Sequence, residues 1–132
     1  MSPFDINIAN YLDFNSVGEY EGAEDWGIYA GLEPEKPNNC ITVFDIGGKP
    51  LHNLLGYTGC FFRIHIRVRG TDDANTLLKC QEIYDLLKFQ RTITANGAIY
   101  ENILAETNIL PGGRDKNNRL LKAMNFTGLY NN

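Results

Sequence analysis

The segment from Cys60 to Leu87 constrains the fold of this chain more than any other. Along its first part, two sets of four residues alternate: apolar Phe62, Ile64, Ile66 and Val68, and polar Arg63, His65, Arg67 and Arg69. A period of two is typical of a β-strand with one buried face and one polar face. Gly70 interrupts the alternation, and Thr71-Asp72-Asp73 offers caps for a helix start. The segment therefore predicts a strand that leads directly into a helix.

The predicted helix over residues 71–87 has an apolar stripe on one side. At 100° per residue this stripe contains Leu77, Cys80, Ile83, Tyr84 and Leu87. The opposite side contains the polar residues Asn75, Lys79, Glu82 and Asp85. Leu78 and Leu86 lie off the stripe. Each is either an ordinary surface leucine or part of a second buried face against a partner or another helix.

The rest of the chain reads as short elements separated by turns. Ser2-Pro3-Phe4-Asp5 begins a helix that ends between Asn15 and Gly18. Strands are predicted at 26–32, 40–44, 93–106 and 119–129, with a hairpin at Asn96-Gly97 in the third, and loops at 18–25, 33–39, 47–59 and 107–118. The predicted fold class is α/β (α+β): a single sheet of about six strands with two helices packed on one face. Residues 1–132 form one domain.

Composition sets the broad class of the protein. A hydrophobic content of 43% over 132 residues is enough for one core. No apolar run approaches the roughly 20 residues of a membrane helix, and the first residues lack the basic region of a signal peptide. The three cysteines, Cys40, Cys60 and Cys80, are far apart and form no metal-binding motif. Buried, reduced thiols in a cytosolic setting are the favoured interpretation.

Charge is distributed unevenly along the sequence. Residues 1–35 contain eight acidic residues and no Lys or Arg, and residues 36–132 contain the other eight acids and all twelve bases. In one interpretation, acidic and basic surfaces face different ways in a monomer. In the other, the chain forms a head-to-tail oligomer in which each copy's acidic surface meets the basic surface of the next.

No catalytic, cofactor-binding or metal-binding set is predicted. Nucleophilic catalysis needs Ser or Cys oriented by His, but His52 and His65 are the only histidines, and no serine sits in a Gly-x-Ser-x-Gly turn. The glycine pairs in residues 47–50 and 111–114 lack the spacing of phosphate-binding loops and indicate turns. Asp72-Asp73 is explained as a helix cap without a metal.

Nucleic-acid binding is the main alternative of another class. Arg63, His65, Arg67 and Arg69 line one strand face with Phe61 at its start, and a sheet with cations and aromatic rings can stack single-stranded nucleic acid. The isoelectric point near 5.1 opposes this interpretation. The favoured explanation is that these arginines pair with the acidic first third of the same chain or of an adjacent subunit.

The pattern over nearly the whole chain resembles a family of viral structural proteins. It comprises an N-terminal helix, an acidic loop, the run NNCITVFDIGGKP, the strand end IRVRG followed by DDAN and IYDLL, the hairpin ITANGAIY, and GGRDKNNR before a closing strand with NFTG. This is similar to the minor capsid or tail-terminator family of tailed bacteriophages, proteins at the head–tail junction of long-tailed phages. The sequence departs from the pattern at residues 120–123, which are less aromatic than expected.

The resemblance implies a structural protein and not an enzyme. Members of this family form a ring, here expected to be a homohexamer, that caps the tail tube and joins it to the head connector. The expected partners are other copies of the chain, the major tail tube protein and the head connector or stopper protein. DNA passes through the ring without specific binding, and no cofactor or membrane is involved. The protein would belong to the virion and assemble in the host cytoplasm. The alternatives are a neck adaptor, stopper or minor capsid protein of the same junction, and a small sheet-based single-stranded nucleic-acid-binding protein.

The interface residues predicted from these patterns lie in the long loops, on the polar strand face and on the second helix. The long loops 47–59 and 107–118 could reach the tube or the connector, and the first of them is apolar for a solvated loop. The candidates from loops, strands and helix are Leu54, Leu55, Tyr57, Arg63, Arg67, Arg69, Leu78, Leu86, Arg114, Asp115 and Arg119.

Overall fold

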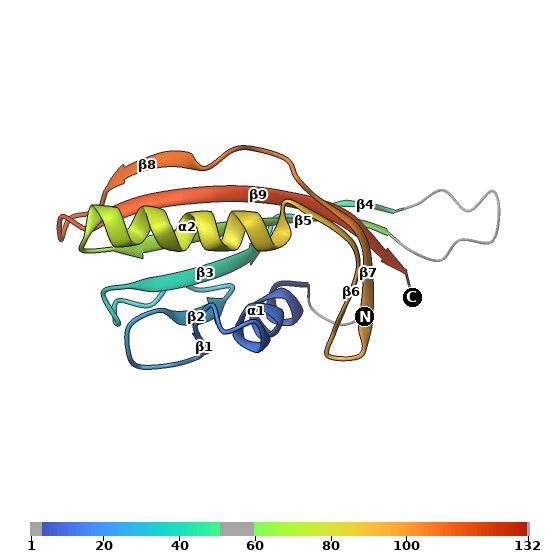
Figure 1. Cartoon of the computed structure of the whole chain (residues 1–132), viewed down its shortest axis with the longest axis horizontal. Coiled ribbons are helices and arrows are strands. Elements are labelled where there is room, and N and C mark those ends of the chain that lie inside the picture. Colours follow the sequence, from blue (N-terminus) through green and yellow to red (C-terminus); the bar gives the residue numbers. More distant parts are fainter. Residues whose placement is uncertain (1–3, 51–59, 132) are drawn as a thin grey trace.

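The computed structural model describes residues 4–50 and 60–131, which form an α+β fold with two helices and one large curled sheet (Figure 1). The helices are α1 (Phe4–Phe14) and α2 (Asp73–Leu87). The strands are β1 (Glu19–Tyr20), β2 (Gly27–Ala30), β3 (Cys40–Asp45), β4 (Lys49–Pro50), β5 (Cys60–Gly70), β6 (Phe89–Ala95), β7 (Ala98–Ala105), β8 (Leu110–Arg114) and β9 (Leu120–Asn131). Neither helix is long and apolar enough to cross a membrane.

The sheet is mixed and larger than the six strands predicted. Its strand order is β1-β2-β3-β5-β9-β7-β6, with β4 paired to β5 and β8 paired to β9 outside this order. The pairs β1–β2 and β2–β3 are parallel, and all other pairs are antiparallel. The additional strands β1, β4 and β8 are short and lie where loops were predicted, because two to five residues are too few to show a period of two.

The strand β8 corrects the prediction that residues 107–118 form an irregular loop. Leu110 and Pro111 pair with Ala123 and Lys122 of β9, and an irregularity follows before Arg114. Proline and glycine normally indicate a loop, but an edge strand tolerates them because one side of its backbone needs no partner. Gly113 provides the left-handed backbone (φ 73°) that the irregularity needs.

The alternation predicted for β5 is confirmed. Phe62, Ile64, Ile66 and Val68 are completely buried. The strand lies between β3 and β9, and the register places Phe126 opposite Ile64 and Met124 opposite Ile66 on the same buried face. The paired strands β5 and β9 therefore lie at the centre of the core.

Both helices pack on this face of the sheet, as predicted. From α1, Phe4 contacts the rings of Phe62 and Tyr130, with ring centroids 5.5 and 5.2 Å away. From α2, Tyr84 contacts Phe126, while Cys80, Ile83 and Leu87 are completely buried. The buried side chains of helices and sheet form one continuous core.

The prediction of the buried α2 stripe is wrong at one residue, Leu77. Leu77 is 48% exposed, and Thr76 is buried in its place. The Thr76 hydroxyl donates to the Asp72 carbonyl at 2.7 Å. It lies so close to Gly70 that a Cβ there would be 2.0 Å from it. The buried stripe therefore contains Thr76, Cys80, Ile83 and Leu87, and Leu77 lies on the flank of the helix.

The predicted hairpin between β6 and β7 is confirmed. Asn96 and Gly97 both have positive φ, 50° and 78°, as a two-residue type I′ turn requires. The Asn96 amide donates to Asn7 of α1 at 3.0 Å, and the Asn7 amide donates to the Tyr100 hydroxyl at 2.6 Å. These bonds hold the hairpin against α1.

Candidate assembly surfaces

The polar face of β5 carries a row of side chains that we call the basic row: Arg63, His65 and Arg67. Arg63 pairs with Glu106 (Nε to Oε2, 3.0 Å), and Arg67 pairs with Glu33 (3.2 Å). His65 Nδ1 lies 2.7 Å from the Asn125 side-chain oxygen. Each member therefore has a partner in its own chain. The hydrogen bond from Arg63 also lowers the pKa of Glu106 and keeps this carboxylate charged.

At one end of the same face, two buried arginines form what we call the arginine clamp, Arg69 and Arg119. Arg69 donates to the carbonyls of Pro37 (2.8 Å), Glu35 (3.2 Å) and Asn38 (3.3 Å). Arg119 donates to the Glu35 carbonyl (2.8 Å) and to the Asp115 carboxylate (2.8 Å). The clamp holds the loop 31–39 over the sheet, since the two guanidinium groups together donate to the carbonyls of Glu35, Pro37 and Asn38.

Asp115 is fixed by the clamp. Burial alone would raise the pKa of its carboxyl group. Hydrogen bonds from the backbone and side chain of Arg119 and from the backbone of Asn117 outweigh burial and lower this pKa. The carboxylate therefore stays charged well into the acidic range.

The predicted interface residues occupy different settings. Arg69 and Arg119 are buried within the subunit, which leaves them little surface for a partner. Arg114 is exposed and pairs with Asp73 at the start of α2, with 2.6 Å between the charged atoms. On α2, Leu78 is 67% exposed and Leu86 packs half-buried against the core. Leu54, Leu55 and Tyr57 lie outside the described residues. An interface role for all eleven candidates stays a prediction.

The uneven charge of the sequence predicted part of this pairing between arginines and acids. The basic residues were expected to pair with the acidic first third, and within one subunit Glu33 contacts Arg67 and Arg69 while Glu35 contacts Arg119. Glu106 was missed as the partner of Arg63. The two residues come together only through the register of β7 and β9, which shifts between Glu101 and Leu104.

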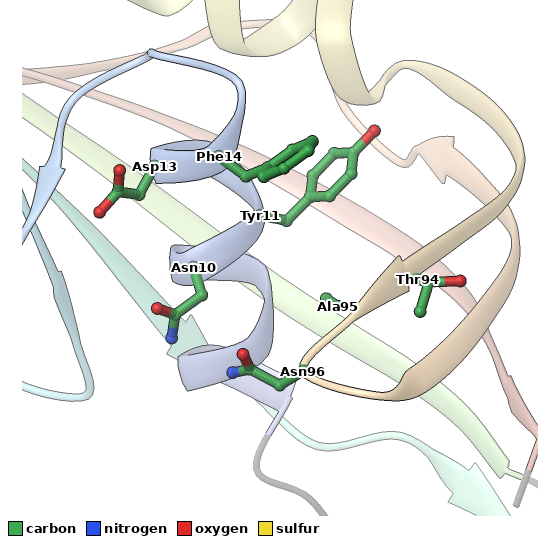
Figure 2. Close-up of a pocket in the computed structure, with 7 residues that line it drawn as sticks. All are labelled: Asn10, Tyr11, Asp13, Phe14, Thr94, Ala95 and Asn96. Atoms are coloured by element: carbon green, nitrogen blue, oxygen red, sulfur yellow. The ribbon is translucent and has the colours of Figure 1, made fainter.

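A groove of about 320 Å³ lies between α1 and the edge of β6 (Figure 2). Its lining comprises Asn10, Tyr11, Asp13 and Phe14 of α1 with Thr94, Ala95 and Asn96 of the hairpin. The Tyr11 and Phe14 rings project from the helix toward the hairpin. Phe14 was not predicted as a surface residue of interest. It is 85% exposed. The sequence could have indicated this exposure, because Phe14 lies 200° around the helix from the apolar Leu12.

The thiols and acidic groups of the described residues show no metal-binding arrangement. Over residues 4–50 and 60–131, no three His, Cys, Asp or Glu side chains group as metal ligands. Cys40 and Cys80 are buried, as expected. Burial raises the pKa of each thiol to about 11. Both are therefore protonated at neutral pH and poor nucleophiles.

These features describe a small α+β protein whose notable surfaces are charged strand faces, a helix-flanked groove and exposed apolar side chains. The sequence matches the family model for bacteriophage tail terminator proteins over residues 11–132. The chain belongs to this family, and is a structural component of a phage virion at the tail junction. No curated protein matches the sequence.

Proposed function

We propose that this protein is the tail terminator of a long-tailed phage, with a homohexameric ring that caps the tail tube and joins it to the head connector. The observation that carries this proposal is the family match over residues 11–132. In this role the protein assembles in the host cytoplasm, and the ring contacts the major tail tube protein on one side and the connector or stopper on the other.

Two unlike ends of the subunit support a ring. The end that contains β1 and the β1–β2 connection carries four exposed acids, Glu19, Glu21, Glu24 and Asp25. Among the described residues none of the four forms an ion pair within the subunit. The edge strand β6 lies at the other end of the strand order. A closed ring needs two different surfaces on each copy that do not overlap, and these two ends meet that requirement.

Charge also favours free passage of DNA over DNA binding. The net charge is −4, and the basic row is paired with Glu106, Asn125 and Glu33. Binding to DNA depends on cations that can replace the counterions of phosphates, and paired arginines are poorly suited to this. This argues against the single-stranded nucleic-acid-binding alternative. A neck adaptor, stopper or minor capsid role at the same junction differs from termination in its partner, which an assembly experiment can identify.

Termination predicts an effect on tube growth. When purified tail tube protein polymerises in the presence of this protein, we expect tubes to stop growing and to carry a ring-shaped density at one end in electron micrographs. Tubes formed alone, or with a heat-denatured sample of this protein as a control, should continue to lengthen. If tubes grow equally long in all three samples and no density binds their ends, the chain does not terminate tails, and an adaptor, stopper or minor capsid role becomes the better explanation.

A further inference from the structure

The strand β6 has an open edge. It is the last strand of the sheet order and pairs only with β7. The Asn96-Gly97 turn makes Ala95 and Ala98 a hydrogen-bonded pair, so the N–H and C=O groups of Thr94 and Thr92 point away from β7. Within the part of the chain that the structure describes, no other backbone or side chain bonds to these groups. A row of unpaired backbone groups is a template for another strand.

The other free edges are protected in ways that β6 is not. At the opposite edge of the sheet, β1 is only two residues long, and the Asp13 carboxylate accepts from the Tyr20 N–H at 3.0 Å. The strand β8 carries Pro111 and an irregularity at Gly113. These are the usual devices that prevent pairing of sheet edges. By contrast, β6 runs for seven residues without a proline, and Arg91 is its single charged residue.

The groove beside this edge has room for an added segment. It lies between Thr94 of β6 and the last turns of α1, and the Tyr11 and Phe14 rings extend into it (Figure 2). A strand paired with β6 would bury part of Phe14, which is otherwise among the most exposed large apolar side chains. Backbone hydrogen bonds would supply affinity in such a contact, and the aromatic rings would select an apolar side chain of the added segment.

We propose that the open edge of β6 is a strand-addition site for a segment of a second copy of this chain. The proposal rests on the proposed ring. It identifies one of the two surfaces that meet where neighbouring copies contact each other in that ring. Charge indicates a second copy as the occupant. Arg91 is exposed on β6 without an ion-pair partner among the described residues, and the far end of the neighbouring copy carries unpaired acids, Glu19 and Glu21 among them. Because the two ends are distinct, each copy can receive one neighbour while it contacts another.

The test compares Thr92→Pro with Thr92→Ala in the full chain. Proline removes the outward N–H at a position where an edge strand tolerates it, whereas alanine keeps this N–H and removes only the side chain. Native mass spectrometry and sedimentation measure the fraction of protein in rings. We expect T92P to weaken ring assembly at least tenfold with little change in melting temperature, and T92A to assemble like the wild type. In the wild-type ring, the amides of Thr92 and Thr94 should be protected from hydrogen exchange.

The outcomes separate this inference from the proposed function. If T92P assembles into rings as well as the wild type does, the strand-addition proposal is wrong, although the proposed ring stands. The same holds if the Thr92 and Thr94 amides exchange freely in the wild-type ring. If T92P forms rings but no longer binds tail tube protein, the edge serves a different protein, and the assignment to a second copy is wrong. If T92P fails to fold, the wild-type exchange measurement decides alone. A wild type that forms no ring under any condition removes the proposed function together with this inference.

Discussion

Replacing Arg69 by methionine should lower the free energy of unfolding by about 3–5 kcal/mol, the usual cost of removing one member of a buried charged pair. The Arg69 side chain is only 3% exposed, and its guanidinium donates to three carbonyls of the loop 31–39 and lies 3.8 Å from the Glu33 carboxylate. Methionine fills similar volume but donates nothing, so the Pro37 and Asn38 carbonyls lose their donor, while the Glu35 carbonyl keeps Arg119. Urea denaturation followed by circular dichroism measures the change.

Arg67→Met is the matched control. Arg67 pairs with the same Glu33 carboxylate, but its side chain is 39% exposed. An exposed ion pair contributes about 0–1 kcal/mol, so this variant should unfold close to the wild-type urea concentration. Equal losses of stability in both variants would mean that the loop does not depend on the clamp. A wild-type midpoint for Arg69→Met would show that the buried guanidinium contributes nothing to the fold.

Truncation of the core should have a comparable effect. Ile64 of β5 and Leu87 of α2 are both completely buried and belong to the same core from opposite layers. Ile64→Ala or Leu87→Ala should cost about 2–5 kcal/mol through lost apolar burial and the cavity that remains. A clear fall in melting temperature is therefore expected for each variant.

Leu78→Ala provides the control on the same helix. Leu78 is 67% exposed and faces away from the sheet, so its truncation should change stability by no more than about 0.5 kcal/mol. Unchanged melting curves for both core variants would mean that the buried and polar faces of β5 are inverted by one residue, since a shift of one position exchanges the two faces of a strand.

Local patterns determined the parts of the fold that could be predicted. The alternation in β5 and the Asn96-Gly97 turn depend on neighbouring residues only, and both are confirmed. The strands β1, β4 and β8 were missed because two to five residues are too few to show a period of two. Leu77 was misplaced because the polar Thr76 takes the buried position of that turn, beside Gly70.

The candidate surfaces, like the fold, could be predicted only in part from the sequence. Uneven charge correctly indicated that acids of the first third pair with arginines of β5, and Glu33 does so within one subunit. Sequence could not show that Arg69 is buried by this pairing while Arg63 stays accessible, because that depends on where the loop 31–39 crosses the sheet. The open edge of β6 was equally hidden, since an edge is a property of strand order and not of any one strand.

The mass of the assembled protein tests the central claim most directly. Purified protein, alone and mixed with tail tube protein, would be measured by native mass spectrometry over a range of concentrations. The account predicts one closed species of six copies of the 14.9 kDa chain, which negative-stain images should show as a ring. A monomer at every concentration in both samples, together with the absence of a ring from imaged virions, would contradict it.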